Sequence, residues 1–179
     1  MRTIRQRRTA ARLLAGGAAL AAAIAIAGRA GVRVNLTPSY PIGLWRIVPK
    51  QASYTNGDLA FVCPPNTPIF AMALERGYLP RGICPGGTGP LIKTIVATSG
   101  QRVEIAAAVT IDGKPVANSG ISRMDASGRT LAPAAGGAVP AGQVFLLSDY
   151  SGSFDSRYFG PVPSSGILGL AQPVLTHAR

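Results

Sequence analysis

Residues 91–97 are Leu91-Ile92-Lys93-Thr94-Ile95-Val96-Ala97. β-branched residues favour strands, and a short apolar run of this length is typical of a buried strand. Lys93 interrupts the run with a positive charge. Burial of an ammonium group is costly unless the group is paired or loses its proton, and desolvation lowers a lysine pKa by up to about 3–5 units. The segment therefore predicts a core strand with a candidate general base, although an edge-strand lysine whose head reaches water fits the same pattern.

Ser39 is the candidate nucleophile for this base. It lies in the segment Asn35-Leu36-Thr37-Pro38-Ser39-Tyr40-Pro41-Ile42-Gly43, where two prolines and a glycine predict a fixed turn that presents the hydroxyl. The one histidine, His177, lies next to the C-terminal end, where chains fray, so a Ser-His-Asp triad is not expected. A Ser–Lys pair is a known variant of the same chemistry. A serine with only a structural role in the turn is the alternative.

The first 33 residues differ from the rest of the chain. They contain seven arginines and no acidic residue, and residues 13–27 form an uncharged apolar stretch. This arrangement predicts a signal peptide or membrane anchor that directs residues 34–179 across the inner membrane. The stretch fits a signal-peptide core and is short for a spanning helix, so cleavage after Ala27 and a persistent anchor are both open.

The net charge of +11 comes mainly from this N-terminal segment. Residues 34–179 contain 11 basic and 7 acidic residues, with no basic stripe interleaved with aromatic residues, so nucleic acid is not an expected partner. They are numerous enough for one domain, and frequent Gly and Pro with little helical periodicity predict a mostly β fold. Strands are expected at residues 43–48, 58–63, 91–97, 102–105, 109–111, 144–147 and 167–175, with one short helix at residues 68–76.

The two cysteines, Cys63 and Cys84, bracket the expected helix. In an oxidising compartment such a pair most simply forms one disulfide; two unpaired, small apolar side chains are the alternative. A metal site is not expected, because no histidine accompanies them, and no cofactor is expected.

A dense polar loop follows the expected strand at residues 144–147. Residues 148–160 contain four serines, two aspartates and an arginine. Asp155 is placed to pair with Arg157, and the hydroxyl of Ser153 is a candidate to orient an amine base. A purely structural turn is the alternative.

These segments together resemble the signal peptidase I superfamily, in which a serine box, a lysine on a later apolar strand and a Ser-x-Asp-Ser-Arg box occur in this order. The chain resembles more particularly the TraF-type conjugative transfer signal peptidases, which process the pilin of a mating-pair pilus. It departs from housekeeping signal peptidases in having a proline two residues after the serine and Ser148-Asp149-Tyr150 in place of Gly-Asp-Asn. The segments that carry the resemblance are Ser39-Tyr40-Pro41-Ile42-Gly43-Leu44-Trp45, Gly57-Asp58, Cys63-Pro64-Pro65, Arg76-Gly77-Tyr78-Leu79, Cys84-Pro85-Gly86-Gly87, Leu91-Ile92-Lys93 and Ser148 to Pro163.

The resemblance implies a signal peptidase I-like β fold behind an N-terminal anchor helix, with a periplasmic serine peptidase domain. It implies a pilin precursor or another secreted protein as substrate. The acyl-enzyme would be resolved either by water, giving a linear pilin, or by the amine of the pilin itself, giving a cyclic one, and the sequence does not select between them. The implied site consists of Ser39 as nucleophile, Lys93 as general base, Asp155 as a residue associated with activity, Thr37 and the Ser39 N–H as oxyanion donors, Ser153 to orient Lys93, and Arg157 to hold the loop with Asp155.

Three other functions stay open on the sequence alone. A general leader peptidase would use the same residues on many precursors. A non-catalytic pilus assembly factor would bind pilin by adding its strand to a sheet edge. A self-cleaving Ser–Lys protease would cut its own chain.

Overall fold

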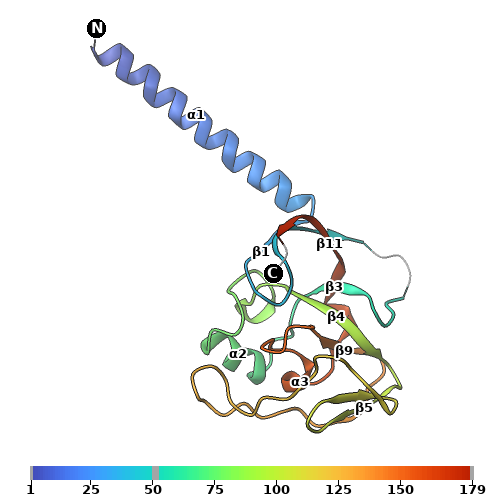
Figure 1. Cartoon of the computed structure of the whole chain (residues 1–179). Helices are drawn as coiled ribbons and strands as arrows, with labels where there is room; N and C mark the ends of the chain where they lie inside the picture. The colour runs from blue at the N-terminus through green and yellow to red at the C-terminus, as the bar shows by residue number, and fades with distance from the viewer. Residues whose placement is uncertain (1, 50–52, 178–179) are drawn as a thin grey trace.

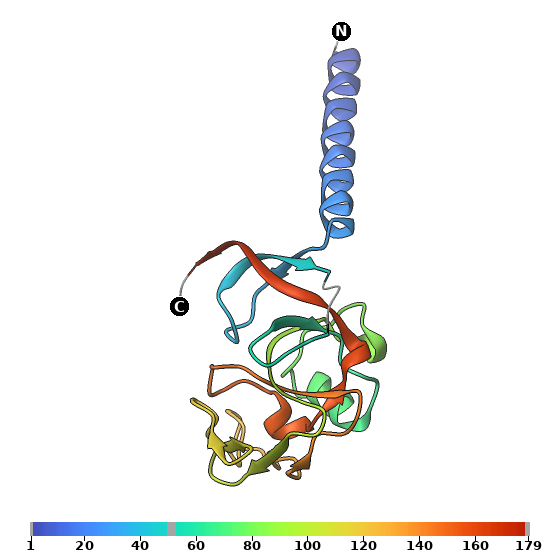
Figure 2. The same ribbon diagram turned by 90° about the vertical axis from the view of Figure 1, so that its right-hand side faces the viewer.

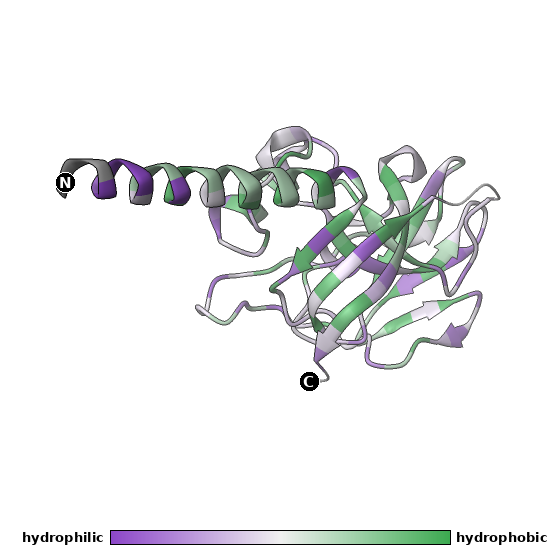
Figure 3. Ribbon diagram, turned by 90° about the horizontal axis from the view of Figure 1, so that it is seen from above, coloured by the Kyte–Doolittle hydropathy of each residue, from purple (hydrophilic) through white to green (hydrophobic). Residues whose placement is uncertain are grey.

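The computed structural model describes residues 2–49 and 53–177. Its N-terminal part is one helix, α1 (Arg2–Arg29), which projects from a β-rich body (Figures 1 and 2). Residues 5–26 are exposed, with the hydrophilic ones gathered toward the N-terminal end (Figure 3). The segment Arg5–Arg29 reaches a mean hydropathy of 1.8 and is long and apolar enough to cross a membrane, a property that anchors and signal sequences share.

A tight joint connects α1 to the first strand. Only Ala30 and Gly31 separate the helix from β1 (Val32–Asn35), which begins two residues before the expected segment boundary. Gly31 has φ +81°, and a Cβ there would lie 2.9 Å from the carbonyl oxygen of Ile47, so only glycine fits. The N–H of Ile47 donates to the Gly31 carbonyl at 2.9 Å. The end of the helix is therefore fastened directly to the sheet.

The body is built from two antiparallel sheets. The larger sheet has seven strands in the order β1-β2-β11-β3-β4-β9-β10, and the smaller has four in the order β7-β6-β5-β8. In the described part of the body, residues 32–49 and 53–177, two α-helices and two 3₁₀ turns lie between the strands. The bounds are β2 (Ile42–Val48), β3 (Leu59–Val62), α2 (Pro68–Glu75), η1 (Pro85–Gly87), β4 (Leu91–Thr98), β5 (Arg102–Ile105), β6 (Val109–Ile111), β7 (Lys114–Pro115), β8 (Gly137–Ala138), β9 (Gln143–Leu147), α3 (Ser156–Phe159), β10 (Val162–Pro163), η2 (Ser164–Gly166) and β11 (Ile167–His177).

The expected fold class is confirmed, since strands dominate the body and an apolar helix precedes it. Each expected strand is present within a few residues. Helix α2 starts at Pro68, as expected, because the first helical position needs no N–H partner. The sequence analysis does not predict β1, β7, β8, β10 or α3, which have only two to four residues each and show no periodicity.

Strand β4 lies inside the larger sheet, between β3 and β9. Leu91 and Ile95 belong to the core cluster that includes residues of α2 and the aromatic residues Phe154 and Tyr158. Ile92 belongs to a second cluster, with Tyr40 and Trp45. Since successive side chains of a strand point to opposite faces, Lys93 points to the same side as Leu91 and Ile95. The lysine therefore enters the core beneath the polar loop at residues 148–157.

The expected disulfide is present. Cys63 and Cys84 are bonded, with their Cα atoms 5.4 Å apart, and both described cysteines are thereby used. The bridge encloses residues 64–83, which include α2 and the turn that follows it; this segment is called the disulfide lobe below. A loop of about 20 residues gives a stabilisation of about 3 kcal/mol by the chain-entropy estimate.

Candidate active site

Ser39 lies in the loop that joins β1 to β2, called the nucleophile loop below (residues 36–41). The loop is closed by the pairing of Asn35 with Gly43 at the ends of the two strands. The Ser148 hydroxyl donates to the Ser39 carbonyl oxygen at 2.7 Å, and the indole N–H of Trp45 donates to the Pro41 carbonyl oxygen at 2.9 Å. Ser39 itself is half-buried and lines a cavity. The turn expected around it is thus held from both sides.

Lys93 is buried, with 3% of its surface exposed. Its Nζ donates a hydrogen bond to Oγ of Ser153. Burial lowers the pKa of Lys93 from 10.5 to about 8, the charge of Asp155 opposes this shift, and the charge of Arg157 adds to it. The alternative of an edge-strand lysine with a solvated head is wrong, because Lys93 is buried on a strand inside the sheet.

Ser153 lies between the candidate nucleophile and the candidate base. Its Oγ is 3.2 Å from Oγ of Ser39, and it accepts the hydrogen bond from Lys93. The three side chains come from segments far apart in the sequence and form a continuous chain of polar contacts. The structure therefore brings together the serine, the lysine and the second serine that the sequence analysis singles out.

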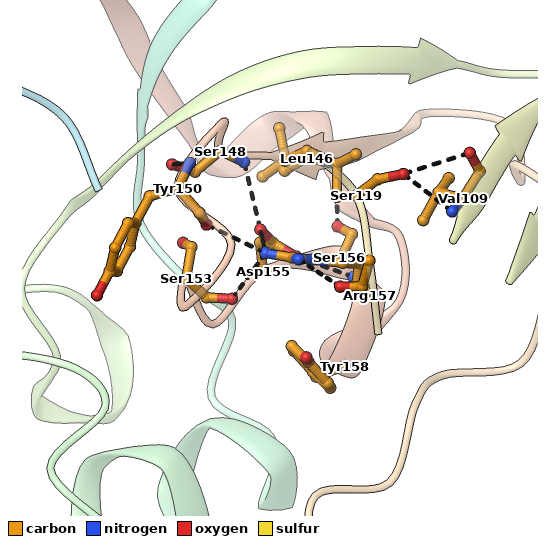
Figure 4. A network of polar contacts seen from close by, with 12 residues as sticks. Val109, Ser119, Leu146, Ser148, Tyr150, Ser153, Asp155, Ser156, Arg157 and Tyr158 are labelled. Carbon is orange, nitrogen blue, oxygen red and sulfur yellow. Dashed lines mark hydrogen bonds and ion pairs between the residues drawn. The ribbon is translucent and has the colours of Figure 1, made fainter. Parts of the chain in front are cut away.

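Asp155 and Arg157 form a buried ion pair behind Ser153 (Figure 4). Both side chains are fully buried, and Arg157 donates from Nε to Asp155 Oδ1 at 2.8 Å and from Nη2 to Oδ2 at 2.9 Å. Nη2 also donates to the Ser153 carbonyl oxygen at 3.1 Å, and the Ser148 N–H donates to Asp155 at 3.2 Å. Asp155 is not among the residues that line the cavity. Its carboxylate is used to hold the loop that carries Ser153.

Thr37 also lines the cavity, but its hydroxyl is engaged elsewhere. Oγ1 of Thr37 donates to Oδ1 of Asn35 at 2.7 Å, and the Thr37 N–H donates to the same oxygen at 3.1 Å. A hydroxyl has one proton to donate, so Thr37 has to turn away from Asn35 before it can donate to an oxyanion.

The cavity is a groove of about 750 Å³ with Ser39 and Lys93 in its wall. It is lined by the nucleophile loop, the start of β4 and the loop at residues 150–154. Residues 77–80 of the disulfide lobe and residues 122 and 124–126 also line it, and the Tyr78 hydroxyl donates a hydrogen bond of 2.5 Å to Asp125. Its apolar lining includes Leu36, Pro38, Leu79, Pro80, Leu91, Ile92, Met124, Tyr150 and Phe154. The volume and lining suit an extended apolar peptide.

Two functional candidates are absent from the sequence prediction. Asn35 is buried and makes hydrogen bonds throughout the nucleophile loop, and Ser148 binds the carbonyl group of Ser39 itself. The role of Asn35 could be expected from the segment Asn35-Leu36-Thr37, because an asparagine side chain commonly accepts a hydrogen bond from the backbone N–H two residues ahead. No local signal marks the contact of Ser148 with Ser39.

Ser39 and the buried Lys93 thus line one groove of a β body that follows an apolar helix. The chain matches the family model for signal peptidase, peptidase S26, over residues 5–176, and it belongs to this family of serine peptidases.

Three curated proteins that are similar to this chain are transfer proteins named TraF. The chain is 52% identical over 170 residues to a conjugal transfer protein TraF of Agrobacterium tumefaciens (strain 15955), covering 94% of this chain and 97% of that one. It is 56% identical over 146 residues to TraF of Agrobacterium fabrum (strain C58), covering 82% and 83%, and 41% identical over 176 residues to a plasmid transfer protein TraF of Escherichia coli, covering 96% and 97%. The predicted resemblance to TraF-type proteins is confirmed.

Among solved structures, a signal peptidase I from Enterococcus faecalis V583 aligns with a TM-score of 0.42 at 18% identity, covering 68% of this chain and 98% of that one.

Proposed function

We propose that this chain is a membrane-anchored serine endopeptidase of conjugation, with Ser39 as nucleophile and Lys93 as general base, that cleaves the precursor of a conjugative pilin. The observation that carries the proposal is the contact chain from the buried Lys93 through Ser153 to Ser39 at the wall of the groove. A base of depressed pKa within hydrogen-bond reach of a serine is the arrangement that activates a weak nucleophile.

In the proposed reaction, neutral Lys93 accepts a proton from Ser153 as Ser153 accepts the proton of Ser39. The Ser39 Oγ attacks the scissile carbonyl carbon and forms a tetrahedral oxyanion. The Ser39 N–H and the Thr37 hydroxyl are the proposed oxyanion donors. Protonated Lys93 then returns its proton through Ser153 to the leaving amine, and the acyl-enzyme remains on Ser39.

Asp155 and Arg157 act through Ser153 in this proposal. The Arg157 guanidinium binds the Ser153 carbonyl oxygen and is itself held by Asp155. Their charges act in opposite directions on the Lys93 pKa, since Asp155 raises it and Arg157 lowers it. The ion pair therefore orients the relay hydroxyl and helps to set the pH at which the base is neutral.

The substrate and location are inferred from the relatives and from the anchor-like helix. The names of the relatives support a role in conjugation, and a signal peptidase acts on exported precursors. We place α1 in the inner membrane, with residues 34–179 as the periplasmic peptidase domain. The Cys63–Cys84 disulfide supports this location, because disulfides form in the periplasm and are rare in the cytosol. Water and the amine of the pilin are the two candidate acceptors for the acyl group.

The test is co-expression with a conjugative pilin precursor, followed by the intact mass of the pilin. We expect a shortened pilin with the wild-type protein and with the exposed-serine control Ser165→Ala, and only full-length precursor with Ser39→Ala. A mass lower by one water than the linear fragment identifies cyclisation. Equal pilin masses with wild type and Ser39→Ala would overturn the proposal and favour an assembly factor.

The pH dependence of processing is the second expectation. Only neutral Lys93 accepts a proton, and its pKa is about 8, so kcat/KM should rise about tenfold per pH unit below pH 7 and level off above pH 9. The measurement is the initial rate of pilin processing by purified full-length protein between pH 6 and 10. The control His177→Gln should give the same profile. A flat profile across this range would contradict Lys93 as the base.

A further inference from the structure

Asn35 is buried at the end of β1 and makes more side-chain hydrogen bonds than its place next to a turn requires. Its Oδ1 accepts from the N–H and the hydroxyl of Thr37, at 3.1 and 2.7 Å. Its Nδ2 carries two hydrogens and lies 3.0, 2.9 and 3.1 Å from the carbonyl oxygens of Thr37, Tyr40 and Pro41, so one hydrogen is shared between two of these acceptors. A common asparagine turn uses only the first of these contacts. The amide is oriented uniquely, because three carbonyl groups face its NH₂ end and an N–H faces its oxygen.

The composition of the nucleophile loop explains why such an amide is needed. Pro38 and Pro41 have no N–H, so the loop has few backbone donors for its own carbonyl groups. Asn35 supplies donors from the inside of the loop. Gly43, its partner across the strands, leaves room for no side chain, since a Cβ there would lie 2.1 Å from the Leu175 carbonyl oxygen. The conformation of the nucleophile loop therefore depends on hydrogen bonds from the side chain of Asn35.

The same side chain controls the hydroxyl of Thr37. Oδ1 of Asn35 can only accept, so Thr37 must be the donor in the bond of 2.7 Å. This bond holds the Thr37 oxygen at the groove wall and directs its proton at Oδ1 of Asn35, which lines the same groove. When an oxyanion forms nearby, a rotation about the C–O bond redirects the proton without moving the oxygen. The bond from the Thr37 N–H to Oδ1 of Asn35 remains after this rotation, so Asn35 still holds Thr37 in place when its hydroxyl donates to the oxyanion.

We propose that Asn35 is a positioning residue of the peptidase, which holds the nucleophile loop in its reactive shape and sets the Thr37 hydroxyl for the oxyanion. This inference rests on the proposed function of Ser39. Loss of the Asn35 side chain should slow the chemical step and leave the binding of substrate in the groove largely unchanged. A loss in kcat with little change in KM is therefore expected.

The test uses purified full-length protein and the pilin precursor, with kcat and KM measured from the mass spectra over time. Asn35→Ala should lower kcat about 10²-fold, in the range seen for loss of an oxyanion donor, with KM changed less than about threefold. Thr37→Val should lower kcat at least tenfold, and Thr37→Ser should restore most of it. In the Asn35→Ala background, Thr37→Val should cost less than about twofold more, because the two residues act as one unit.

Controls keep this result apart from unfolding and from failure of the proposed function. Asn56→Ala removes an exposed asparagine that bonds to Gln101 and should leave kcat unchanged. Asn35→Asp keeps the acceptor for Thr37 but loses both donated hydrogens, and it should lower kcat even if Asn35→Ala fails to fold. Additive losses for Asn35→Ala and Thr37→Val, or an effect on KM alone, would overturn the inference. Processing by Ser39→Ala would overturn the proposed function instead.

Discussion

Replacement of Lys93 by arginine should abolish pilin processing, although the positive charge is kept. Arginine stays protonated at every working pH because its pKa is far above that of lysine, and it has no acceptor atom in this form, so it cannot take the proton relayed from Ser39. Lys93→Met, which keeps a similar length without charge, should abolish processing as well. The measurement is the intact mass of co-expressed pilin, with the exposed Lys114→Arg as matched control. Near-normal turnover by Lys93→Arg would contradict the assignment of the base.

The methionine variant should also be the more stable protein near neutral pH. Burial lowers the Lys93 pKa from 10.5 to about 8, so below pH 8 the folded protein carries a buried charge that costs about 3 kcal/mol. Between pH 8 and about 10 the unfolded chain binds more protons than the folded one, and this cost disappears as pH rises. Lys93→Met should therefore raise the free energy of unfolding at pH 6–7, and its advantage should shrink toward pH 10. Urea unfolding at the two pH values measures both effects.

Arg157→Met should be strongly destabilising, by about 3–5 kcal/mol, because it leaves the carboxylate of Asp155 buried without its partner. For a chain of this size the melting temperature should fall by about 10 °C. Thermal unfolding measures the loss, and the exposed arginine variant Arg102→Met should change stability by less than about 1 kcal/mol. The double variant Asp155→Leu with Arg157→Met should recover part of the loss. If the double variant were less stable than Arg157→Met, the unpaired Asp155 carboxylate would not be the cause of the lost stability.

The same substitution should change the pH profile of any folded enzyme that remains. The Arg157 charge lowers the pKa of Lys93 and the Asp155 charge raises it, so loss of Arg157 alone raises the pKa of the base. The rise of kcat/KM with pH should then move to higher pH.

The strands were predictable from local sequence because β-branched and apolar residues cluster between Gly- and Pro-rich turns. Strand β4 was the clearest, and its single charge marked the candidate base. β1 and α3 could not be predicted, since four residues carry no period, and their existence depends on pairing with β2 and on the Asp155 cap. The disulfide was predictable because the chain has only two cysteines and an anchor-like N-terminal segment.

The candidate site was predictable as a list of residues but not as an arrangement. Ser39, Lys93 and Ser153 were marked by their unusual contexts and by the family resemblance. The pairing of Asp155 with Arg157 follows from their spacing of two residues, and the fold adds that the Asp155 carboxylate lies outside the groove lining. The contact of Ser148 with the Ser39 carbonyl joins residues 109 positions apart, and only the folded chain brings them together.

The joint at Ala30 and Gly31 has a consequence for which peptide bonds the enzyme can reach. In the anchored chain proposed above, α1 ends at the bilayer surface and passes into β1 after two residues, with Gly31 bonded to Ile47 of the neighbouring strand. An extended chain spans about 3.5 Å per residue, so β1 starts within about 10 Å of the end of the helix. The nucleophile loop follows β1 directly and therefore stands at a nearly constant height above the lipid. If α1 is anchored as proposed, we expect the distance of a peptide bond from the membrane, as well as its side chains, to decide whether it is cleaved.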